Sequence, residues 1–361
     1  MDTSPTAPEL QKNIPGLNSV VLKGFGPDPG PPWWWQQIQA DAGLCKITVK
    51  HLTYRNKRSS KEIGALELPF FLLRMLPVYL ELRRQYDYVF TFECSLTSFA
   101  MAFWQTLLFS RKPKHVILQF IMREKTASLA SRLKYALMKW LFSSVHLAVC
   151  SARAECEYYR EAFGWPASKV AYVPYHASAT IELPPPGSDG GYLFAAGRTF
   201  RDFPTMIAAV RPTSHATVIV ASRSVAKLPT DAPHIRLHED IPIAEFSKLL
   251  EGARVVVVPL QDRRISTGQI VILHAMALGK PVIVTRTSGS VDYIDDGENG
   301  LLVPPSDPEA LRRAIDRVMS DAGLRQRLGE AARKTVLKKH LPHHYTQMVR
   351  LTLLERQRTK H

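Results

Sequence analysis

The feature that most constrains this chain is an alternation of short apolar runs with amphipathic segments, which occurs twice. In the first half, apolar runs such as 86–93 and 114–122 are separated by segments whose apolar residues recur at helical spacing. In the second half, runs such as 254–260 and 280–287 repeat this arrangement. Strands that alternate with helices form parallel β-α-β units. The sequence therefore predicts an α/β protein with two tandem Rossmann-like, doubly wound domains facing a cleft, where the ligand would bind.

A proline-rich break separates the two halves. Residues 181–191 contain three consecutive prolines followed by glycine and serine, which neither a helix nor a central strand accommodates. We therefore expect an N-terminal domain at 1–180, a linker at 181–191 and a C-terminal domain at 192–340. Residues 341–361 are predicted to form a basic C-terminal helix that packs back on the N-terminal domain.

The net charge is +15, from 47 Lys and Arg against 32 Asp and Glu, and it is concentrated in two segments. Residues 111–139 carry eight basic side chains against one acid, and so do residues 333–361. This excess favours phosphates, nucleic acid or an anionic membrane as partners. No helix-turn-helix, zinc-finger or RNA-recognition signature is present, so nucleic acid is not expected as a partner.

The segment 129–141 has an amphipathic pattern with two interpretations. Its large apolar residues recur at helical spacing, and its basic residues fall outside that stripe. Either the helix lies on anionic lipid, or its apolar stripe packs on its own domain and its basic face is solvated.

The N-terminal sequence has neither a basic start nor an apolar run, and no stretch has the length of a membrane-spanning helix. The four cysteines form no C-x-x-C pair and are expected to be reduced. The predicted location is cytoplasmic, or peripheral at the inner face of the membrane.

Two arginines follow the first strand of the second half. In the sequence AAGRTFRDF, Gly197 ends the strand and allows a tight turn, and Arg198 and Arg201 follow. Paired guanidinium N–H groups can bind a diphosphate. The alternative is that each arginine pairs with a surface carboxylate.

A second stretch, residues 259–281, passes from a strand through a polar turn into a helix. Ser266 or Thr267 is the expected N-cap, with Gly268 just inside the helix. The free N–H groups of such a helix start suit an anionic phosphate. The third stretch, 288–308, is rich in turn-forming glycine and acidic residues.

Taken in order, the GR turn, GQIVILHAMALGKPVIVT and SGSVDYIDDGENGLLVPPSDPEAL resemble the donor domain of the retaining GT-B glycosyltransferases of family four, the glycosyl transferases group 1. The resemblance covers roughly residues 190–325. It implies that Arg198 and Arg201 hold the donor diphosphate. It also implies that the backbone near Thr267, Gly268 and Gln269 approaches the phosphates and sugar.

The family also has two glutamates eight positions apart, which contact the donor sugar and the ribose. Here Ser266 and His274 occupy those positions. His274 could still hydrogen-bond a ribose hydroxyl, or it could simply pack in the wall of the site.

On the N-terminal side, the family often places a histidine near the reacting sugar. This chain has Gln119 at the corresponding strand end, and Glu93 ends a neighbouring apolar run. Gly24 and Gly26 form a turn after the first strand that either approaches a phosphate or is a plain turn. These four are the expected acceptor-side or sugar-side residues.

The resemblance implies transfer of a hexose from a nucleotide diphosphate sugar to a hydroxyl of a sugar or lipid-linked acceptor. It further implies retention, no metal and no other cofactor. Polysaccharide or glycolipid assembly is the expected context. Two alternatives remain open: a catalytically degenerate nucleotide-sugar-binding or scaffold protein, and a sugar-nucleotide epimerase of the same fold.

Overall fold

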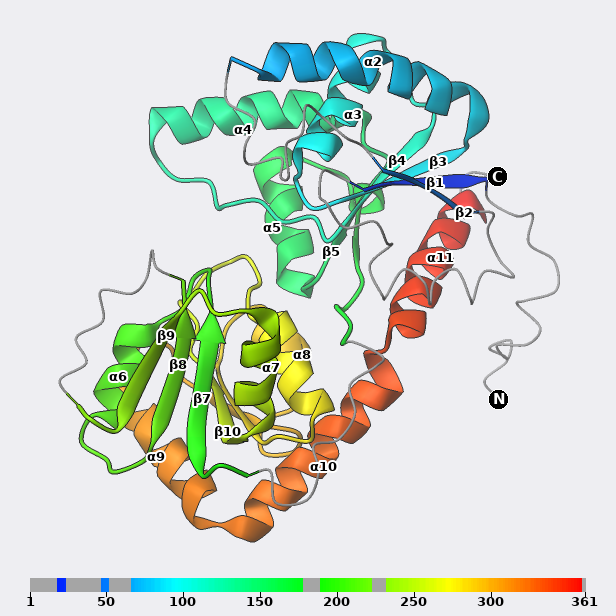
Figure 1. Ribbon diagram of the computed structural model, residues 1–361. Coiled ribbons are helices and arrows are strands. Elements are labelled where there is room, and N and C mark those ends of the chain that lie inside the picture. Colours follow the sequence, from blue (N-terminus) through cyan, green and yellow to red (C-terminus); the bar gives the residue numbers. More distant parts are fainter. Residues whose placement is uncertain (1–17, 24–46, 52–65, 178–188, 223–231, 359–361) are drawn as a thin grey trace. The chain divides into compact units, whose positions relative to one another are not determined.

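The computed structural model describes residues 18–23, 47–51, 66–177, 189–222 and 232–358 (Figure 1). It divides into two compact units. The first contains residues up to Cys150, then Cys156–Tyr172 and the segment from Val349 onward. The second contains Ser151–Glu155 and Val173–Met348.

The first unit is built on a six-stranded parallel sheet of order β2-β1-β3-β4-β5-β6. Its strands are β1 (Ser19–Lys23), β2 (Ile47–His51), β3 (Tyr88–Phe92), β4 (Lys114–Leu118), β5 (Leu147–Cys150) and β6 (Val170–Tyr172). Its connecting helices are α2 (Leu68–Gln85), α3 (Leu96–Leu107), α4 (Leu129–Leu141) and α5 (Arg153–Phe163), with the short turns η2 (Phe142–Ser144) and η3 (Ala167–Lys169).

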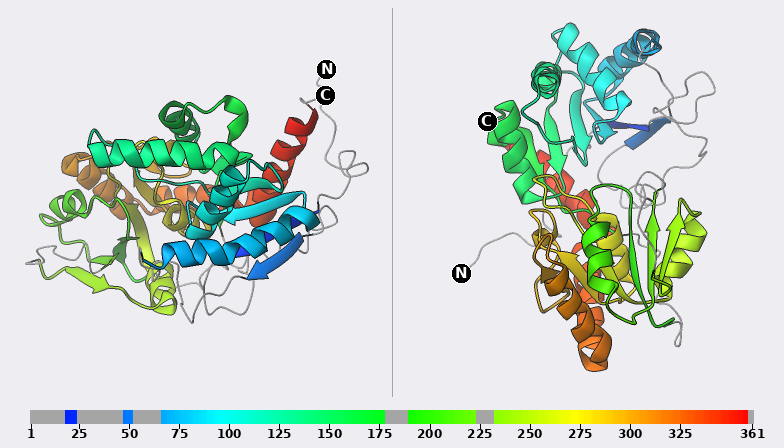
Figure 2. Two further views of the ribbon diagram at one scale, coloured as in Figure 1. Left: turned by 90° about the horizontal axis from the view of Figure 1, so that it is seen from above. Right: turned by 90° about the vertical axis from the view of Figure 1, so that its left-hand side faces the viewer.

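Helices α2, α3 and α4 lie side by side in this unit, as Figure 2 (left) shows from above. The core beneath α2 and α3 contains Phe71, Tyr79 and Met101, all nearly inaccessible to solvent. Burial of these side chains is the main source of stability for this layer.

The second unit repeats the arrangement with a parallel sheet of order β12-β11-β10-β7-β8-β9. Its strands are β7 (Tyr192–Gly197), β8 (Thr217–Ala221), β9 (Ile235–Glu239), β10 (Ala253–Val258), β11 (Val282–Thr285) and β12 (Leu301–Val303). Its helices are α6 (Phe203–Val210), α7 (Ile243–Glu251), α8 (Gln269–Ala277), the 3₁₀ turn η4 (Ser290–Asp292), α9 (Pro308–Ser320) and α10 (Ala322–Lys339). The last helix, α11 (Pro342–Arg358), begins in the second unit and ends in the first.

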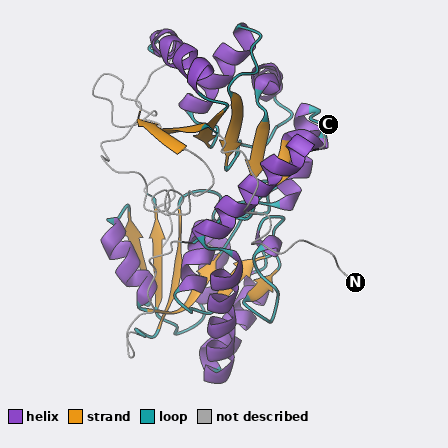
Figure 3. Cartoon of the chain, turned by 90° about the vertical axis from the view of Figure 1, so that its right-hand side faces the viewer, coloured by secondary structure: helices purple, strands orange, loops and turns teal. Residues whose placement is uncertain are grey.

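Helices cover both faces of this second sheet, which explains why its strands are apolar throughout. Phe194 of β7 packs in the core under α7 and α8, and Leu193 packs in the core under α6 and α9. Val256 and Val257 of β10 divide between the same two cores. Figure 1 shows these helix pairs on opposite sides of β7 and β8, and Figure 3 shows the strands flanked by helices. A strand buried on both faces reads as a continuous apolar run rather than an alternating one.

The predicted fold class is confirmed, because both units are parallel sheets with alternating helices. The main segment of the second unit starts at Val173, and residues 181–188 of the predicted linker lie outside the described residues. The end of α11 groups with the first unit, where Gln357 Nε2 donates to Tyr88 Oη at 3.0 Å and Arg356 donates to the Val170 carbonyl at 2.7 Å. Among the described residues, none of the helices combines the length and apolar character needed to cross a bilayer.

Gly329 is the position in α10 where a side chain is least tolerable. A Cβ there would overlap the carbonyl oxygen of Gly279, which follows α8. We expect Gly329→Ala to lower the free energy of unfolding by about 1–3 kcal/mol, because α10 must move away from the backbone it packs against. The measurement is urea denaturation followed by circular dichroism.

Gly323→Ala is the matched control in the same helix. Its Cβ would meet only Asp321 Oδ1, at 3.4 Å, and alanine favours a helix over glycine. The control should leave stability unchanged or raise it. Equal effects of the two substitutions would contradict the packing described for α10 and α8.

Candidate functional site

Three loops meet at the carboxyl edge of the second sheet. They follow β7, β10 and β11, which are neighbours in the sheet. We call these segments, residues 198–202, 259–268 and 286–289, the loop cluster. The carboxyl edge of an open parallel sheet is where such folds place their ligands.

Hydrogen bonds connect the three loops to one another. Asp202 N donates to the Pro259 carbonyl at 3.0 Å, and Gln261 N donates to the Phe200 carbonyl at 3.0 Å. Ser288 Oγ donates to the Arg263 carbonyl at 2.9 Å. The loop cluster is therefore tied together by hydrogen bonds between its own three segments.

The two predicted arginines have different environments. Arg201 is buried: its Nε donates to the Ala196 carbonyl at 2.9 Å and its Nη1 to the Thr199 carbonyl at 2.8 Å. Burial lowers the pKa of Arg201 to about 10, so it remains charged at neutral pH. Arg198 is exposed, and its guanidinium lies 3.9 Å from Asp240 Oδ1. Arg198 can thus turn toward a ligand, whereas Arg201 adds fixed positive charge while it holds the turn.

Gly197 is required by this packing of Arg201. It has a φ of 142°, and a Cβ at this position would overlap the Arg201 guanidinium. The predicted role of Gly197 as the residue that permits the tight turn is consistent with this geometry.

The start of α8 differs from the sequence prediction. The N-cap is Gly268, with a left-handed φ of 95°, and neither Ser266 nor Thr267 caps the helix. A Cβ at Gly268 would press against Leu260 Cδ2 and Val258 Cγ1, at 3.1 and 3.2 Å. Serine and threonine are preferred caps where the chain enters extended, but here the backbone turns through a conformation that favours glycine.

Gln269, the first residue of α8, is buried, and its side-chain Nε2 has no hydrogen-bond partner in the described part of the chain. A Cβ on Gly289 would approach that Nε2 to 3.6 Å. A buried donor without an acceptor is costly in a folded protein. Together with the free N–H groups of the first helical turn, it makes this edge suited to an anionic or hydroxyl-rich ligand.

Glu155 is a residue of this site that the sequence did not reveal. Its carboxylate is almost inaccessible to solvent, and Oε1 accepts from Ser266 N at 2.8 Å. The other oxygen accepts from Ser151 N and Ala152 N, both at 3.1 Å. Burial raises its pKa to about 7, against the opposing effect of these hydrogen bonds. An acid in the first turn of a helix ordinarily caps that helix, so nothing in the sequence links Glu155 to Ser266.

His274 lies on α8 and is partly buried, and this burial lowers its pKa. Its imidazole is therefore neutral at pH 7 and offers one donor and one acceptor. A ribose hydroxyl could use either, so the predicted role of His274 stays a prediction.

In the first unit, Glu93 and Gln119 follow the paired ends of β3 and β4, where Phe92 is opposite Leu118. Both have left-handed backbones, with φ of 52° and 53°. Such strain in residues other than glycine clusters at functional sites. Ser98 holds the turn, because its hydroxyl lies 2.7 Å from the Glu93 carbonyl. Gly24 and Gly26, the other two residues predicted here, lie outside the described residues.

The structure thus brings Gly197, Arg198, Arg201, Ser266, Thr267, Gly268 and Gln269 to one edge of the second sheet. Glu93 and Gln119 share an edge of the first sheet. Within the described ranges, no three His, Cys, Asp or Glu side chains gather in a group that could hold a metal ion. The chemistry available at the loop cluster is cationic and donor-rich.

The two parallel sheets and their covering helices match the GT-B fold of solved glycosyltransferase structures. Residues 199–321 match the family model described as Glycosyl transferases group 1. A sucrose-phosphate synthase from Thermosynechococcus elongatus has the same fold at a TM-score of 0.71 and 18% identity, covering 95% of this chain and 99% of that one.

One further solved structure and one curated relative are also similar to this chain. An Anabaena protein, solved in complex with UDP and glucose, has a TM-score of 0.65 at 14% identity, covering 94% of this chain and 100% of that one. The lipopolysaccharide core biosynthesis glycosyltransferase LpsE of Rhizobium meliloti is 43% identical over 67 residues, 19% of this chain and 20% of that protein. The matched segments span about a quarter or less of the curated relatives' length, 24% and 20% for two of them.

Glu155→Gln tests the carboxylate described above. A carboxyl whose pKa is raised from 4.5 to about 7 binds its proton more tightly in the folded state. Its contribution to stability is present below pH 4.5 and is lost as the pH rises through 7. The quantity to compare is the difference in free energy of unfolding between the wild type and Glu155→Gln. This difference should fall by on the order of 3 kcal/mol between pH 4.5 and pH 8.

The measurement is urea denaturation of both proteins across that pH range. A constant offset between the two is expected in addition, because the glutamine NH₂ faces backbone donors. An offset that does not vary with pH would contradict a buried, titrating Glu155.

Proposed function

We propose that the loop cluster binds the diphosphate of a nucleotide sugar and that the protein is a glycosyltransferase. The observation that carries this proposal is the unpartnered Nε2 of Gln269 at the start of α8, next to the arginine-bearing turn after β7. The match of residues 199–321 to a glycosyltransferase family supports it. So does the Anabaena structure of the same fold that contains UDP and glucose.

The proposed reaction transfers a hexose from the diphosphate to an acceptor hydroxyl. The bond between the anomeric carbon and the diphosphate oxygen breaks, and its electron pair stays on that oxygen. The acceptor hydroxyl forms the new bond to the anomeric carbon and releases its proton. The new charge therefore develops on the leaving diphosphate.

Three features of the chain would stabilise that charge. Arg198 is exposed and can approach the phosphates, while Arg201 supplies a fixed charge behind the turn. The first turn of α8 directs N–H groups and the positive end of a helix dipole toward the same edge. Such preorganised charge acts most strongly where charge appears in the transition state. We accordingly propose a reaction in which these groups, rather than a metal, balance the diphosphate.

We also propose that the reaction retains the configuration at the anomeric carbon. The proposed acceptor is either a sugar or a lipid-linked molecule, and the proposed role is in polysaccharide or glycolipid assembly. Their support is the family match and the likeness to a lipopolysaccharide core glycosyltransferase. The cytoplasm is the proposed location.

One set of observations favours the binding-protein alternative. Ser266 and His274 stand where the family has glutamates, and Arg201 is committed to backbone carbonyls. A protein that binds a nucleotide sugar without transferring or hydrolysing it would fit these substitutions. Incubation with donor alone and with donor plus acceptor, followed by product analysis, separates transfer, epimerisation and simple binding.

Arg198→Ala tests the proposal at its exposed cation. We expect it to lower kcat/KM for sugar transfer by roughly 100- to 1,000-fold, because a charge that stabilises the leaving diphosphate is removed. The loss should appear mainly in kcat. The measurement is steady-state transfer from the donor that gives the largest thermal shift in a panel of UDP-, GDP-, ADP- and dTDP-sugars.

Arg313→Ala is the matched control, since Arg313 is exposed on α9 of the same unit and away from the loop cluster. Wild-type kinetics are expected for this variant. Unchanged transfer by Arg198→Ala would reject the proposed site, whereas equal losses in both variants would indicate a non-specific effect of charge.

A further inference from the structure

Helix α4 presents its large apolar side chains to solvent. Its outward row consists of Leu129, Leu133, Leu137 and Trp140, which are 69%, 63%, 51% and 49% exposed. At about 100° per residue these four fall on one narrow stripe of the helix. Of the apolar stripe predicted from the sequence, only Leu141 is therefore buried in its own domain, and the other four residues do not pack there.

The inward face of α4 is fixed by an aromatic and polar anchor instead. Tyr135 is buried, its hydroxyl donates to the Arg123 carbonyl at 2.6 Å, and its ring stacks on Phe163 at 5.2 Å between centroids. At the end of the helix, Thr106 Oγ1 donates to the Leu141 carbonyl at 2.8 Å. Rotation of α4 to bury the outward row would break these contacts.

Cations border the outward row on both sides. Arg132 and Lys139 lie along one side and Lys134 along the other, all exposed, and the helix contains no acid. Long basic side chains can lie along an apolar surface while their charges reach an anionic layer. A second copy of the same helix would place like charges against each other, so the charge pattern favours an anionic lipid surface over self-association.

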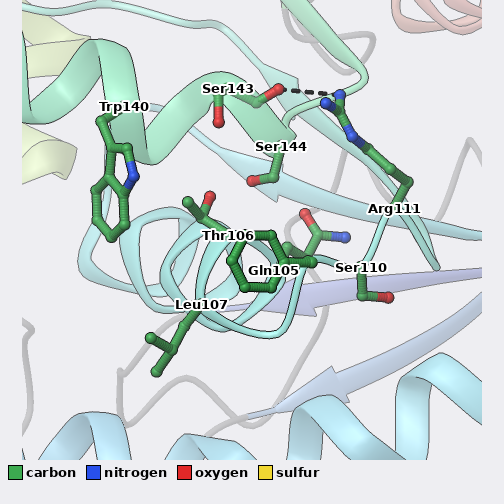
Figure 4. A pocket seen from close by; sticks show the side chains of 9 residues that line it. Gln105, Thr106, Leu107, Ser110, Arg111, Trp140, Ser143 and Ser144 are labelled. Carbon is green, nitrogen blue, oxygen red and sulfur yellow. Dashed lines mark hydrogen bonds between the residues drawn. The ribbon is translucent and has the colours of Figure 1, made fainter.

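A pocket of 310 Å³ continues the outward row at the end of α3 (Figure 4). Trp140, Leu107 and Phe109 supply apolar wall, and Phe109 is 97% exposed. Ser143, Ser144 and Arg111 supply the polar side.

Two cations converge beside this pocket on one neutral oxygen. Arg111 Nη1 donates to the Ser143 carbonyl at 3.1 Å, as Figure 4 shows, and Lys169 Nζ donates to the same oxygen at 2.8 Å. Among the described residues, no carboxylate pairs with either cation. Burial and the charge of Arg111 lower the pKa of Lys169 to about 8. A phosphate between the two would relieve their mutual repulsion.

We propose that α4 and the end of α3 dock on an anionic phospholipid bilayer. The outward row and Phe109 enter the interface, and a lipid headgroup phosphate lies between Arg111 and Lys169. This surface belongs wholly to the first unit and is independent of the donor site in the second.

The test is co-sedimentation of the full chain with vesicles of phosphatidylcholine that contain about 40 mol% phosphatidylglycerol, compared with pure phosphatidylcholine. Binding should need the anionic lipid and weaken at least about tenfold between roughly 0.05 and 0.5 M salt. The double variant Leu133→Ser/Leu137→Ser should lose binding about tenfold or more. Arg132→Gln/Lys139→Gln, which keeps the outward row, should lose it about 10- to 30-fold. Arg111→Gln should reduce the preference for anionic vesicles.

Ile243→Ser/Leu337→Ser is the matched control, because these side chains are 77% and 49% exposed on the second unit. It should bind vesicles as the wild type does. Equal binding to neutral vesicles would overturn the proposal. So would an unaffected charge variant, or a dimer in sedimentation velocity that Leu133→Ser/Leu137→Ser abolishes. Thermal shift with UDP on the same samples separates these outcomes from failure of the donor site, which the vesicle variants should leave unchanged.

Discussion

The carboxylate of Glu155 is the interaction on which the loop cluster depends. Its two oxygens accept three backbone N–H groups, one of them from Ser266 in the loop that leads into α8. Without that acceptor, a buried backbone donor would be unsatisfied just before the helix start. Glu155 therefore fixes the approach to Gly268, and Gly268 in turn sets the direction in which the first turn of α8 presents its N–H groups. The proposed phosphate site is a consequence of this backbone geometry more than of any single side chain.

The two arginines that follow β7 have different roles. Arg201 closes the turn by bonding its own carbonyls and cannot tolerate a side chain at position 197. Arg198 remains exposed and adaptable. A buried charge behind an exposed one would make the proposed diphosphate site electropositive before the ligand binds. Preorganisation of this kind reduces the rearrangement needed during reaction.

Much of the fold could be predicted because doubly covered parallel strands leave an unmistakable apolar run, as in 254–258 and 282–285. The gathering of Arg198, Gly268 and Gln269 followed from the same logic, since consecutive strand ends share an edge. Glu155 could not be predicted, because its partner Ser266 lies 111 positions away. The sequence also did not predict that Arg201 is buried or that the outward row of α4 is exposed to solvent. Periodicity shows that a helix has an apolar face, but only the surrounding contacts decide whether that face points inward.

Isothermal titration calorimetry of the full chain with nucleoside mono- and diphosphates tests the central claim most directly. The account predicts that, for the preferred base, the diphosphate binds more tightly than the monophosphate, because the second phosphate engages the turn after β7 and the start of α8. It also predicts that the advantage shrinks with rising salt. Equal affinity for both nucleotides, or no heat with any of them, would contradict a diphosphate site at this edge of the sheet.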